Sequence, residues 1–210
     1  MKYAMVIDLR KCIGCYGCQI FCKAENATPR GVLWSRVLLY EVGKYPNVKK
    51  VPLPVLCMQC EDAPCVTVCP SGASVKRSNG IVTIDPKKCT GCLNCLVACP
   101  YGARQVYDRI GDHFPGQGFI PYEEMGYKRH ALGLVGKCDF CLSRIEKGLK
   151  PACVENCMTK ARYFGDLDDP SSDVSQLVRS DGVFQIHPGF PPKAECGEPD
   201  ARTSVYYLPR

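Results

Sequence analysis

The chain has 210 residues, and 17 of them are cysteine, a share of about 8 per cent that indicates an architecture built on cysteine chemistry. This length allows one compact domain or two small ones, and it excludes a large catalytic fold. The 27 Lys+Arg and 21 Asp+Glu residues give a formal net charge of +6, which taken alone would favour a nucleic acid or an anionic lipid as partner. No stretch approaches the roughly 18 apolar residues of a membrane span, and the first residues show no apolar stretch typical of an export signal. We therefore expect neither feature in this sequence.

Sixteen of the cysteines fall into four groups of four. The first group is Cys12, Cys15, Cys18 and Cys22, the third is Cys89, Cys92, Cys95 and Cys99, and both have the spacing C-x2-C-x2-C-x3-C. The second group is Cys57, Cys60, Cys65 and Cys69, spaced C-x2-C-x4-C-x3-C, and the fourth is Cys138, Cys141, Cys153 and Cys157, spaced C-x2-C-x11-C-x3-C. Cysteines this close together cannot all form disulfides without severe strain, so bound metal is the better interpretation. Cys196 lies outside every group and is expected to be a bystander thiol.

The groups also reveal an internal repeat. The segment Ile7–Cys15 recurs 77 residues later as Ile84–Cys92, and all four cysteines keep this offset. The second and fourth groups are related more loosely, through Cys65–Pro70 and Cys153–Met158. The two kinds of group alternate along the chain, which predicts a duplicated unit that holds two clusters.

The spacing of the first and third groups is typical of bacterial ferredoxins. Three close thiolates on one loop hold a 4Fe-4S cluster, and the fourth cysteine reaches the neighbouring cluster. Gly14 and Gly91 lie where a loop wrapped around a cluster can use positive φ. Structural zinc is the alternative, because the second and fourth groups alone would pass as zinc knuckles, but the triple C-x2-C-x2-C offers too many thiolates in one place. Apolar neighbours should limit the access of water to the clusters: Ile13, Ile20, Leu93, Leu96 and Val97.

Bound clusters also change the charge argument. An oxidised 4Fe-4S cluster with its four thiolates carries a charge of about −2, so four of them would bring the net charge from +6 to about −2. The basic excess then compensates the clusters from within, and a nucleic-acid partner is not expected. Lysines beside cysteines would raise the reduction potentials, with ordinary solvation as the alternative for each: Lys11, Lys23, Lys87, Lys88 and Lys137.

The remaining sequence predicts an α+β fold. We expect strands at Tyr3–Asp8 and Ile81–Asp85, short helices after the third cysteine of each group, and two pseudo-symmetric modules of bacterial-ferredoxin type. One module is split between residues 1–28 and 138–165, and the other spans residues 57–102. Two insertions separate them, the strand-rich residues 29–56 and the glycine- and aromatic-rich residues 103–137. Residues 166–210 have little periodicity, so we expect an extended tail that becomes ordered only on a partner, with Val205–Leu208 as an aromatic contact patch.

These motifs resemble the four-cluster iron–sulfur subunits of molybdopterin oxidoreductases, which include the dimethyl sulfoxide reductase type. The resemblance covers nearly the whole chain and is carried by the alternating groups and by the segments Asp62–Val66, Asn94–Ala103, Lys137–Cys141 and Lys150–Glu155. Phe164–Pro170 is most similar to the small subunits of polysulfide, thiosulfate and arsenate reductases. The resemblance implies a subunit without a catalytic site, which relays electrons between a molybdopterin catalytic subunit and a quinone-reactive, polytopic membrane anchor in anaerobic respiration. It also implies export with the catalytic partner to the periplasmic or outer face of the membrane, with a cytoplasmic location as the alternative.

The resemblance further implies a ligand set for each of four 4Fe-4S clusters. Cluster 1, nearest the catalytic subunit, would be bound by Cys12, Cys15, Cys18 and Cys157, and cluster 2 by Cys22, Cys138, Cys141 and Cys153. Cluster 3 would be bound by Cys57, Cys60, Cys65 and Cys99, and cluster 4, at the quinone-facing end, by Cys69, Cys89, Cys92 and Cys95. Some relatives lack the cysteine at the position of Cys92 and hold three irons, so Cys92 favours four. Met158 departs from the family, which usually has proline after this cysteine.

Two other functions remain open. The runner-up is a soluble polyferredoxin, or the electron-input subunit of a hydrogenase or formate dehydrogenase. The other alternative is a zinc scaffold with no redox role. The insertions and the long tail favour the reductase subunit, since a free electron carrier would not need so much chain outside the cluster-binding motifs.

Overall fold

The computed structural model describes residues 1–186 and 202–210. Within these ranges the chain mixes short helices with four small β-sheets, as an α+β fold predicts. The described residues include no helix that is long and apolar enough to cross a membrane. Cys196 lies outside the described ranges.

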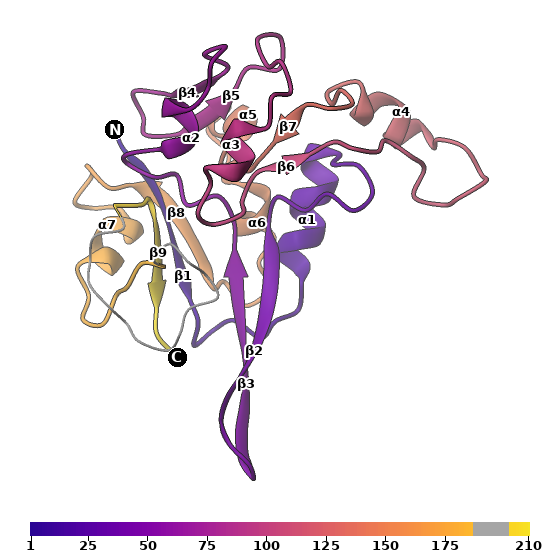
Figure 1. Ribbon diagram of the computed structural model, residues 1–210. Coiled ribbons are helices and arrows are strands. Elements are labelled where there is room, and N and C mark those ends of the chain that lie inside the picture. The colour runs from indigo at the N-terminus through magenta and orange to yellow at the C-terminus, as the bar shows by residue number, and fades with distance from the viewer. Residues whose placement is uncertain (187–201) are drawn as a thin grey trace.

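The largest sheet has three strands, and its central strand is β1 (Tyr3–Asp8), as predicted. Strand β8 (Arg162–Asp166) pairs with β1 in antiparallel orientation, and β9 (Val205–Leu208) pairs with the other edge of β1 in parallel orientation. Alternate residues of β1 belong to two different apolar clusters, one on each face of the sheet. The strand is therefore the structural centre of this part of the molecule (Figure 1).

The expectation that residues 166–210 become ordered only on a partner is wrong for the described part of this tail. Tyr207 in β9 is fully buried in the main core, and its hydroxyl donates a hydrogen bond of 2.9 Å to the carbonyl of Pro54. Helix α7 (Asp173–Val178) packs against the opposite face of the sheet through Val174. The sequence pattern does not show this order, because the strand that pairs with β9 lies at the other end of the chain.

A second, smaller ladder consists of β4 (Ser74–Lys76) and β5 (Val82–Ile84). In this ladder Ser74 is paired with Ile84, whereas in the larger sheet Arg162 is paired with Ile7. Each isoleucine lies five residues before the first cysteine of its group, and each partner lies five residues after the last cysteine of its group. The two ladders therefore have the same register relative to the cysteines.

Four short helices carry the cysteines inward. They are α1 (Gly17–Asn26), α2 (Pro64–Thr67), α3 (Asn94–Val97) and α6 (Ala152–Glu155). The sequence predicts helices that begin after the third cysteine of each group, whereas each helix begins one residue before it. Helix α1 packs on α6 and α2 packs on α3, so each helix pair brings together groups that are distant in sequence. A fifth short helix, α5 (Leu142–Ile145), follows the second cysteine of the fourth group.

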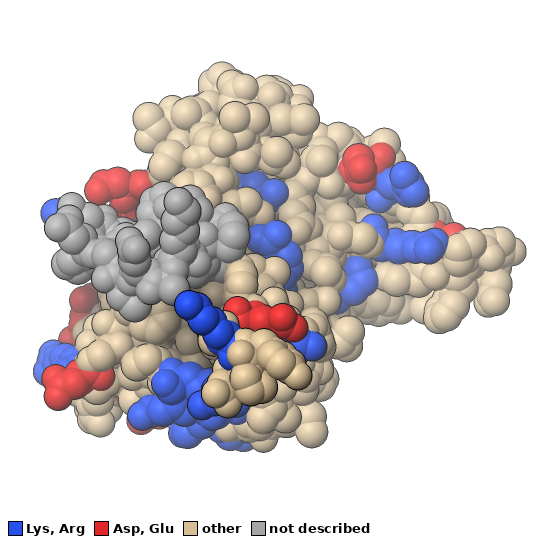
Figure 2. Space-filling view, turned by 60° about the horizontal axis from the view of Figure 1, so that its bottom comes forward, with Lys and Arg blue, Asp and Glu red and all other residues tan. Residues whose placement is uncertain are grey.

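The first insertion forms an antiparallel hairpin of β2 (Arg36–Lys44) and β3 (Asn47–Val55). Its base is buried in the main core through Leu53 and Val55, whereas Tyr45 at its tip is 91% exposed. The hairpin projects away from the remainder of the molecule in Figure 1. Figure 2 shows basic side chains gathered on the face from which it projects.

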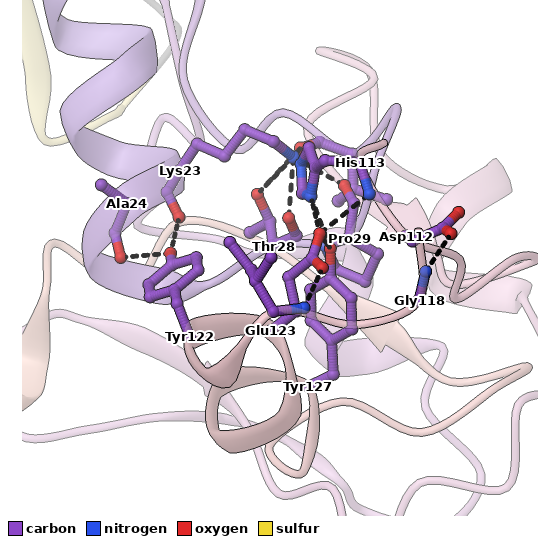
Figure 3. Close-up of polar contacts among 12 residues, drawn as sticks. Lys23, Ala24, Thr28, Pro29, Asp112, His113, Gly118, Tyr122, Glu123 and Tyr127 are labelled. Atoms are coloured by element: carbon purple, nitrogen blue, oxygen red, sulfur yellow. Dashed lines mark hydrogen bonds and ion pairs between the residues drawn. The ribbon is translucent and has the colours of Figure 1, made fainter. Parts of the chain in front are cut away.

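The second insertion contains α4 (Pro121–Tyr127) and a short ladder of β6 (Gln105–Val106) and β7 (Val135–Gly136). Figure 3 shows how it is fastened to α1: the Tyr122 hydroxyl lies 3.1 Å from the carbonyl oxygen of Lys23 and 2.5 Å from that of Ala24. Carbonyls in the last turn of a helix have no partner within the helix. The insertion therefore satisfies backbone groups that α1 leaves free.

A buried carboxylate holds this insertion together. Glu123 is fully buried and accepts hydrogen bonds from the backbone N–H groups of His113 at 2.8 Å and of Ile120 at 3.0 Å. The ring of His113 contacts the same carboxylate and the Tyr127 hydroxyl (Figure 3). Burial opposes the charge of Glu123, but these hydrogen bonds lower its pKa to about 2. The group is therefore ionised at neutral pH.

Candidate iron–sulfur sites

Each loop of the first and third groups starts at an aspartate turn. The Asp8 carbonyl accepts a hydrogen bond of 3.2 Å from the Cys12 N–H, and the Asp85 carbonyl accepts one of 3.1 Å from the Cys89 N–H. The side chain of Asp8 also binds Arg10, whose hydrogen bonds hold the pKa of this buried carboxyl below its ordinary value. The turn ends the strand and redirects the chain around the space next to it.

Both loops use the left-handed conformation at matching positions. Gly14 and Gly91 have φ angles of 72° and 70°, and Tyr16 and Leu93, immediately before the helices, have φ angles of 60° and 63°. Only glycine adopts such angles without cost, so Tyr16 and Leu93 are strained by about 1–2 kcal/mol each. A Cβ atom at Gly91 would also lie 2.8 Å from the carbonyl oxygen of Gly133. The prediction that Gly14 and Gly91 use positive φ angles in these loops is therefore confirmed.

The third and fourth predicted ligand sets each surround a small cavity. One cavity is lined by Cys57, Cys60, Cys65 and Cys99, together with Met58, Ala63, Pro64, Val82, Pro100, Tyr101 and Arg104. The other is lined by Cys69, Cys89, Cys92 and Cys95, together with Ser71, Ala73, Ser74, Ile84, Thr90, Leu93, Arg104 and Val135. The structure thus brings together cysteines from two different groups in each case.

The first and second sets are brought together in the same manner. Burial and then the neighbouring thiols of Cys22, Cys141 and Cys153 raise the pKa of the Cys138 thiol. Burial also raises the pKa of Cys12, and its thiol neighbours are Cys18 and Cys157. Cys15 lies on the same loop as Cys12 and is exposed. The four cysteines of the second set are all buried, so this set is the deepest: Cys22, Cys138, Cys141 and Cys153.

Ligand thiols must lose their protons to bind iron. Burial and the thiols of Cys57, Cys65 and Cys99 raise the pKa of Cys60 to about 12. Cys69 behaves differently, because hydrogen bonds from Ser74 and Ser71 outweigh its burial and lower its pKa to about 7. We therefore expect cluster assembly to release protons and to depend on pH.

Backbone N–H groups point at several of the sulfurs. The Ala161 N–H donates to the Cys157 Sγ at 3.3 Å, and the Ala103 N–H donates to the Cys99 Sγ at 3.4 Å. The same interaction joins Ser74 to Cys69 and Phe140 to Cys138, both at 3.4 Å. Such bonds stabilise thiolate charge and set the potential of a cluster.

The sites fit a doubly negative cluster for a further reason. Arg104 is buried and lines the cavities of both the third and the fourth set. Two of its nitrogens, Nε and Nη2, are buried without a hydrogen-bond partner among the described residues. A buried guanidinium in this state is stabilised by negative charge beside it, and a 4Fe-4S cluster held by these cysteines would supply that charge.

The sequence did not single out two buried cations at these sites, Arg104 and Arg162. Each lies five residues after the last cysteine of its group, and this shared offset was the available signal. Among the five lysines named from the sequence, Lys137 is buried, whereas Lys11, Lys87 and Lys88 are exposed. Lys23 is half-buried and its ammonium donates to the carbonyls of Thr28 and Pro29.

The predicted apolar cover over the outer sets is wrong for most of its residues. Ile13 and Ile20 beside the first set are 67% and 59% exposed, and Val97 beside the fourth set is 84% exposed. Leu93 is also exposed, and only Leu96 is partly covered. These side chains do not close the sites within this chain, because the loops that carry them lie at the surface. Cys15 and Cys92 are exposed at the same two places.

Known proteins are similar to this chain over most of its length. A family model described as the 4Fe-4S dicluster domain matches residues 48–114 and again residues 115–167. The chain is 42% identical to the B subunit of selenate reductase of Mesobacillus selenatarsenatis over 99% of this chain and 72% of the relative. It is 40% identical to the arsenate respiratory reductase iron-sulfur subunit of Shewanella sp. strain ANA-3 over 90% of this chain and 92% of the relative. It is also 41% identical to the B subunit of tetrathionate reductase of Salmonella typhimurium over 84% of this chain and 63% of the relative.

The family match covers more than half of the chain, and two of these relatives align over most of their own length. The first match contains the second and third cysteine groups, and the second match contains the fourth. Zinc knuckles would not explain the match. The chain therefore belongs to the 4Fe-4S dicluster family and is an iron–sulfur electron-transfer subunit of the reductase type.

Proposed function

We propose that this chain relays single electrons through four 4Fe-4S clusters between a molybdopterin catalytic subunit and a membrane quinone-reactive subunit in anaerobic respiration. The observation that supports this best is the sorting of sixteen cysteines into the four ligand sets named above, two of which line separate cavities. When bound, the clusters supply one-electron redox chemistry. The chain itself supplies thiolates, charge and exclusion of water, and it has no substrate chemistry of its own.

The four sets belong to two pseudo-symmetric modules in this proposal. Residues 1–28 with 138–165 form the module of clusters 1 and 2, and residues 57–102 form the module of clusters 3 and 4. The matching register of the two ladders supports this division, since Ile7 opposite Arg162 corresponds to Ile84 opposite Ser74. The matching left-handed residues support it as well.

Burial suggests where electrons enter and leave. The second set is wholly buried and lies within the first module, whereas the first and fourth sets each have one exposed cysteine. Exposed apolar side chains surround these two places, including Ile13 and Ile20 at one and Val97 at the other. We propose that the first place docks on the catalytic subunit and the second on the membrane subunit, which would exclude water from both clusters.

The partner classes come from the relatives. The names of two of them describe subunits of selenate and arsenate reductases, which are assemblies with more than one subunit. We propose the same organisation here, with a large molybdopterin-containing chain that carries the substrate pocket. A periplasmic or outer-face location, reached by export with that chain, is part of the proposal.

Purification of the tagged chain from its native cells tests the proposal. We expect a large molybdenum-containing chain to purify with it, and we expect this iron-containing complex in the membrane-derived fraction. Substitution of the exposed docking residues, Ile13→Glu with Ile20→Glu, should release the large chain while the iron content stays near normal. The matched control, Tyr45→Glu at the tip of the hairpin, should leave the complex intact. A fully loaded chain that purifies alone would favour the soluble polyferredoxin.

A further inference from the structure

Three buried cations lie among the ligand sets. Lys137 is 3% exposed, and Arg104 and Arg162 are each 4% exposed. Within residues 1–186 and 202–210 none of them forms an ion pair with a carboxylate or with the chain terminus. Burying a charge without a counter-charge is costly, so proteins retain it where something else compensates it.

Arg162 lies between the first and second sets. Its Nη2 atom is 3.2 Å from the Sγ of Cys18, which belongs to the first set, and its Nη1 atom is 3.6 Å from the Sγ of Cys153, which belongs to the second. The remaining contact of Nη2 is the Ser35 hydroxyl at 3.3 Å. One guanidinium therefore touches a sulfur of each of two neighbouring sets.

Arg104 has the same relation to the third and fourth sets. It lines both of their cavities, and its charge interacts with Cys65 of the third set and Cys95 of the fourth. Its Nη1 atom donates to the Ser74 hydroxyl at 2.8 Å, which fixes the position of the guanidinium. Its other two nitrogens are the partnerless atoms described above.

Lys137 lies between the second and third sets. Its ammonium donates to the carbonyl of Cys138, in the second set, at 2.9 Å and to the carbonyl of Val82, which lines the cavity of the third. Its charge also acts on Cys65 of the third set. Gln59 ties the same two backbone positions together, since its amide donates to the Cys138 carbonyl and accepts from the Val82 N–H, both at 2.8 Å.

The two arginines reach corresponding places from different parts of the repeat. Arg162 follows the last cysteine of the fourth group, and the corresponding residue after the second group is Ser74. Arg104 instead follows the last cysteine of the third group, and its side chain extends to that Ser74. Each arginine then faces the third cysteines of its two groups, Cys18 with Cys153 in one module and Cys95 with Cys65 in the other. Repetition of the sequence alone would not give this result, because the two arginines do not align.

We propose that Arg162, Lys137 and Arg104 tune the clusters electrostatically. One of these residues lies at each junction between successive clusters, and each raises the midpoint potentials of both clusters beside it. This proposal rests on the cluster assignment of the proposed function. A fixed positive charge in a dry interior stabilises the added electron of a reduced cluster. A cation shared by two clusters raises both potentials in the same direction, so it changes the driving force between them less than a cation beside one cluster alone would.

The test is a redox titration of the loaded chain followed by electron paramagnetic resonance. Arg162→Gln, Lys137→Gln and Arg104→Gln are each compared with the wild type at equal iron content. Each substitution should lower the midpoint potentials of its two adjacent clusters and leave the other two unchanged. We expect about a tenfold fall in the ratio of reduced to oxidised cluster at a fixed applied potential, which is about 59 mV for one electron. Lys88→Gln is the matched control, because Lys88 precedes a ligand cysteine but is exposed, and water should screen its charge.

Charge-retaining variants separate electrostatics from packing. Arg104→Lys, Arg162→Lys and Lys137→Arg should keep near-wild-type potentials. If a neutral variant holds no clusters, the charge-retaining variant decides alone: full iron with unchanged potentials supports the proposal, and shifted potentials overturn it. Equal shifts in the neutral and charge-retaining variants, or shifts in all four clusters at once, would also overturn it. A wild-type chain without 4Fe-4S signals would instead refute the proposed function, so the two failures are distinguishable.

Discussion

The two cluster-binding regions share a strand register and differ in what supports it. The β1–β8 pair and the β4–β5 pair are aligned in the same way with their cysteines. The first pair is extended by β9 and contacts α6 and α7, whereas the second pair has no third strand among the described residues and contacts α2. The repeated sequence therefore determines the loops around the cysteines, and the flanking chain determines how firmly each region is held.

Removal of β9 should give the largest effect and should break the first region. Deletion of residues 202–210 removes three buried side chains from the sheet, Val205, Tyr207 and Leu208, each worth about 1.5–3 kcal/mol. That sum approaches the whole stability of a small domain. We expect loss of cooperative unfolding and of most of the bound iron, measured by urea denaturation and metal analysis.

A point substitution in β9 tests the same dependence with a smaller perturbation. Tyr207→Ala should destabilise the chain by about 3–5 kcal/mol, as for other buried aromatic residues, and Tyr206→Ala, a half-buried neighbour, should cost clearly less. A truncated chain with normal iron and an unchanged unfolding midpoint would show that the first region does not depend on β9.

The two ends of the relay can be compared by substituting one exposed cysteine at each end, with Cys15→Ser and Cys92→Ser. Cys15 and Cys92 occupy corresponding positions in their groups, and both are exposed. Each substitution should damage one cluster and leave the other three, with a loss of up to about four irons, measured by metal analysis and paramagnetic resonance. Cys196→Ser is the control and should be silent, because this cysteine lies outside every group. Loss of a cluster in Cys196→Ser would show that the ligand assignment is wrong.

Glycine substitutions should show that the two loops do not tolerate an added side chain equally well. Gly14→Ala and Gly91→Ala each place a side chain on a left-handed backbone position, which costs about 1–2 kcal/mol of stability. The added Cβ at Gly14 would lie 3.0 Å from the Pro52 side chain, but at Gly91 it would lie 2.8 Å from the backbone oxygen of Gly133, which cannot rotate away. Urea denaturation should therefore rank Gly91→Ala as the more destabilising.

Gly102→Ala isolates the cost of the angle in that series, since φ is 55° there and nothing lies within 4 Å of the added Cβ. If Gly91→Ala costs no more than Gly102→Ala, the close approach of the two loops is not a constraint on folding.

The smallest effect concerns the insertion that is fastened to α1. Hydrogen bonds outweigh burial and lower the pKa of Glu123 to about 2, below the ordinary value of 4.5. Its charge therefore stabilises the folded insertion above about pH 4.5, and this contribution is lost as the pH falls from 4.5 towards 2. Glu123→Gln should remove that part of the acid sensitivity, measured by limited proteolysis of the insertion between about pH 6 and about pH 3. Glu124→Gln, at an exposed position, should behave like the wild type, and an equal effect of both would refute this role.

The sequence predicted those features that are encoded locally. Strand Tyr3–Asp8 and the glycines at positive φ follow from short patterns, and a cysteine spacing restricts which thiols can share a cluster. Strand β9 could not be predicted, because its parallel pairing with β1 joins the two ends of the chain. Arg162 and Arg104 share an offset from a cysteine group, but their burial could not be predicted, because the burial of a charge depends on tertiary packing. The prediction of apolar cover over the outer clusters is wrong for the same reason.

The iron content of the purified chain tests the central claim most directly. Sixteen ligand cysteines in four sets predict about sixteen irons per chain, together with a matching amount of acid-labile sulfide. The measurement needs only protein prepared without oxygen, a protein assay that does not depend on iron, and metal analysis that also detects zinc. A value near sixteen, with no stoichiometric zinc, is the predicted result. A reproducible value near twelve, or zinc in place of iron, would contradict the assignment of four 4Fe-4S clusters.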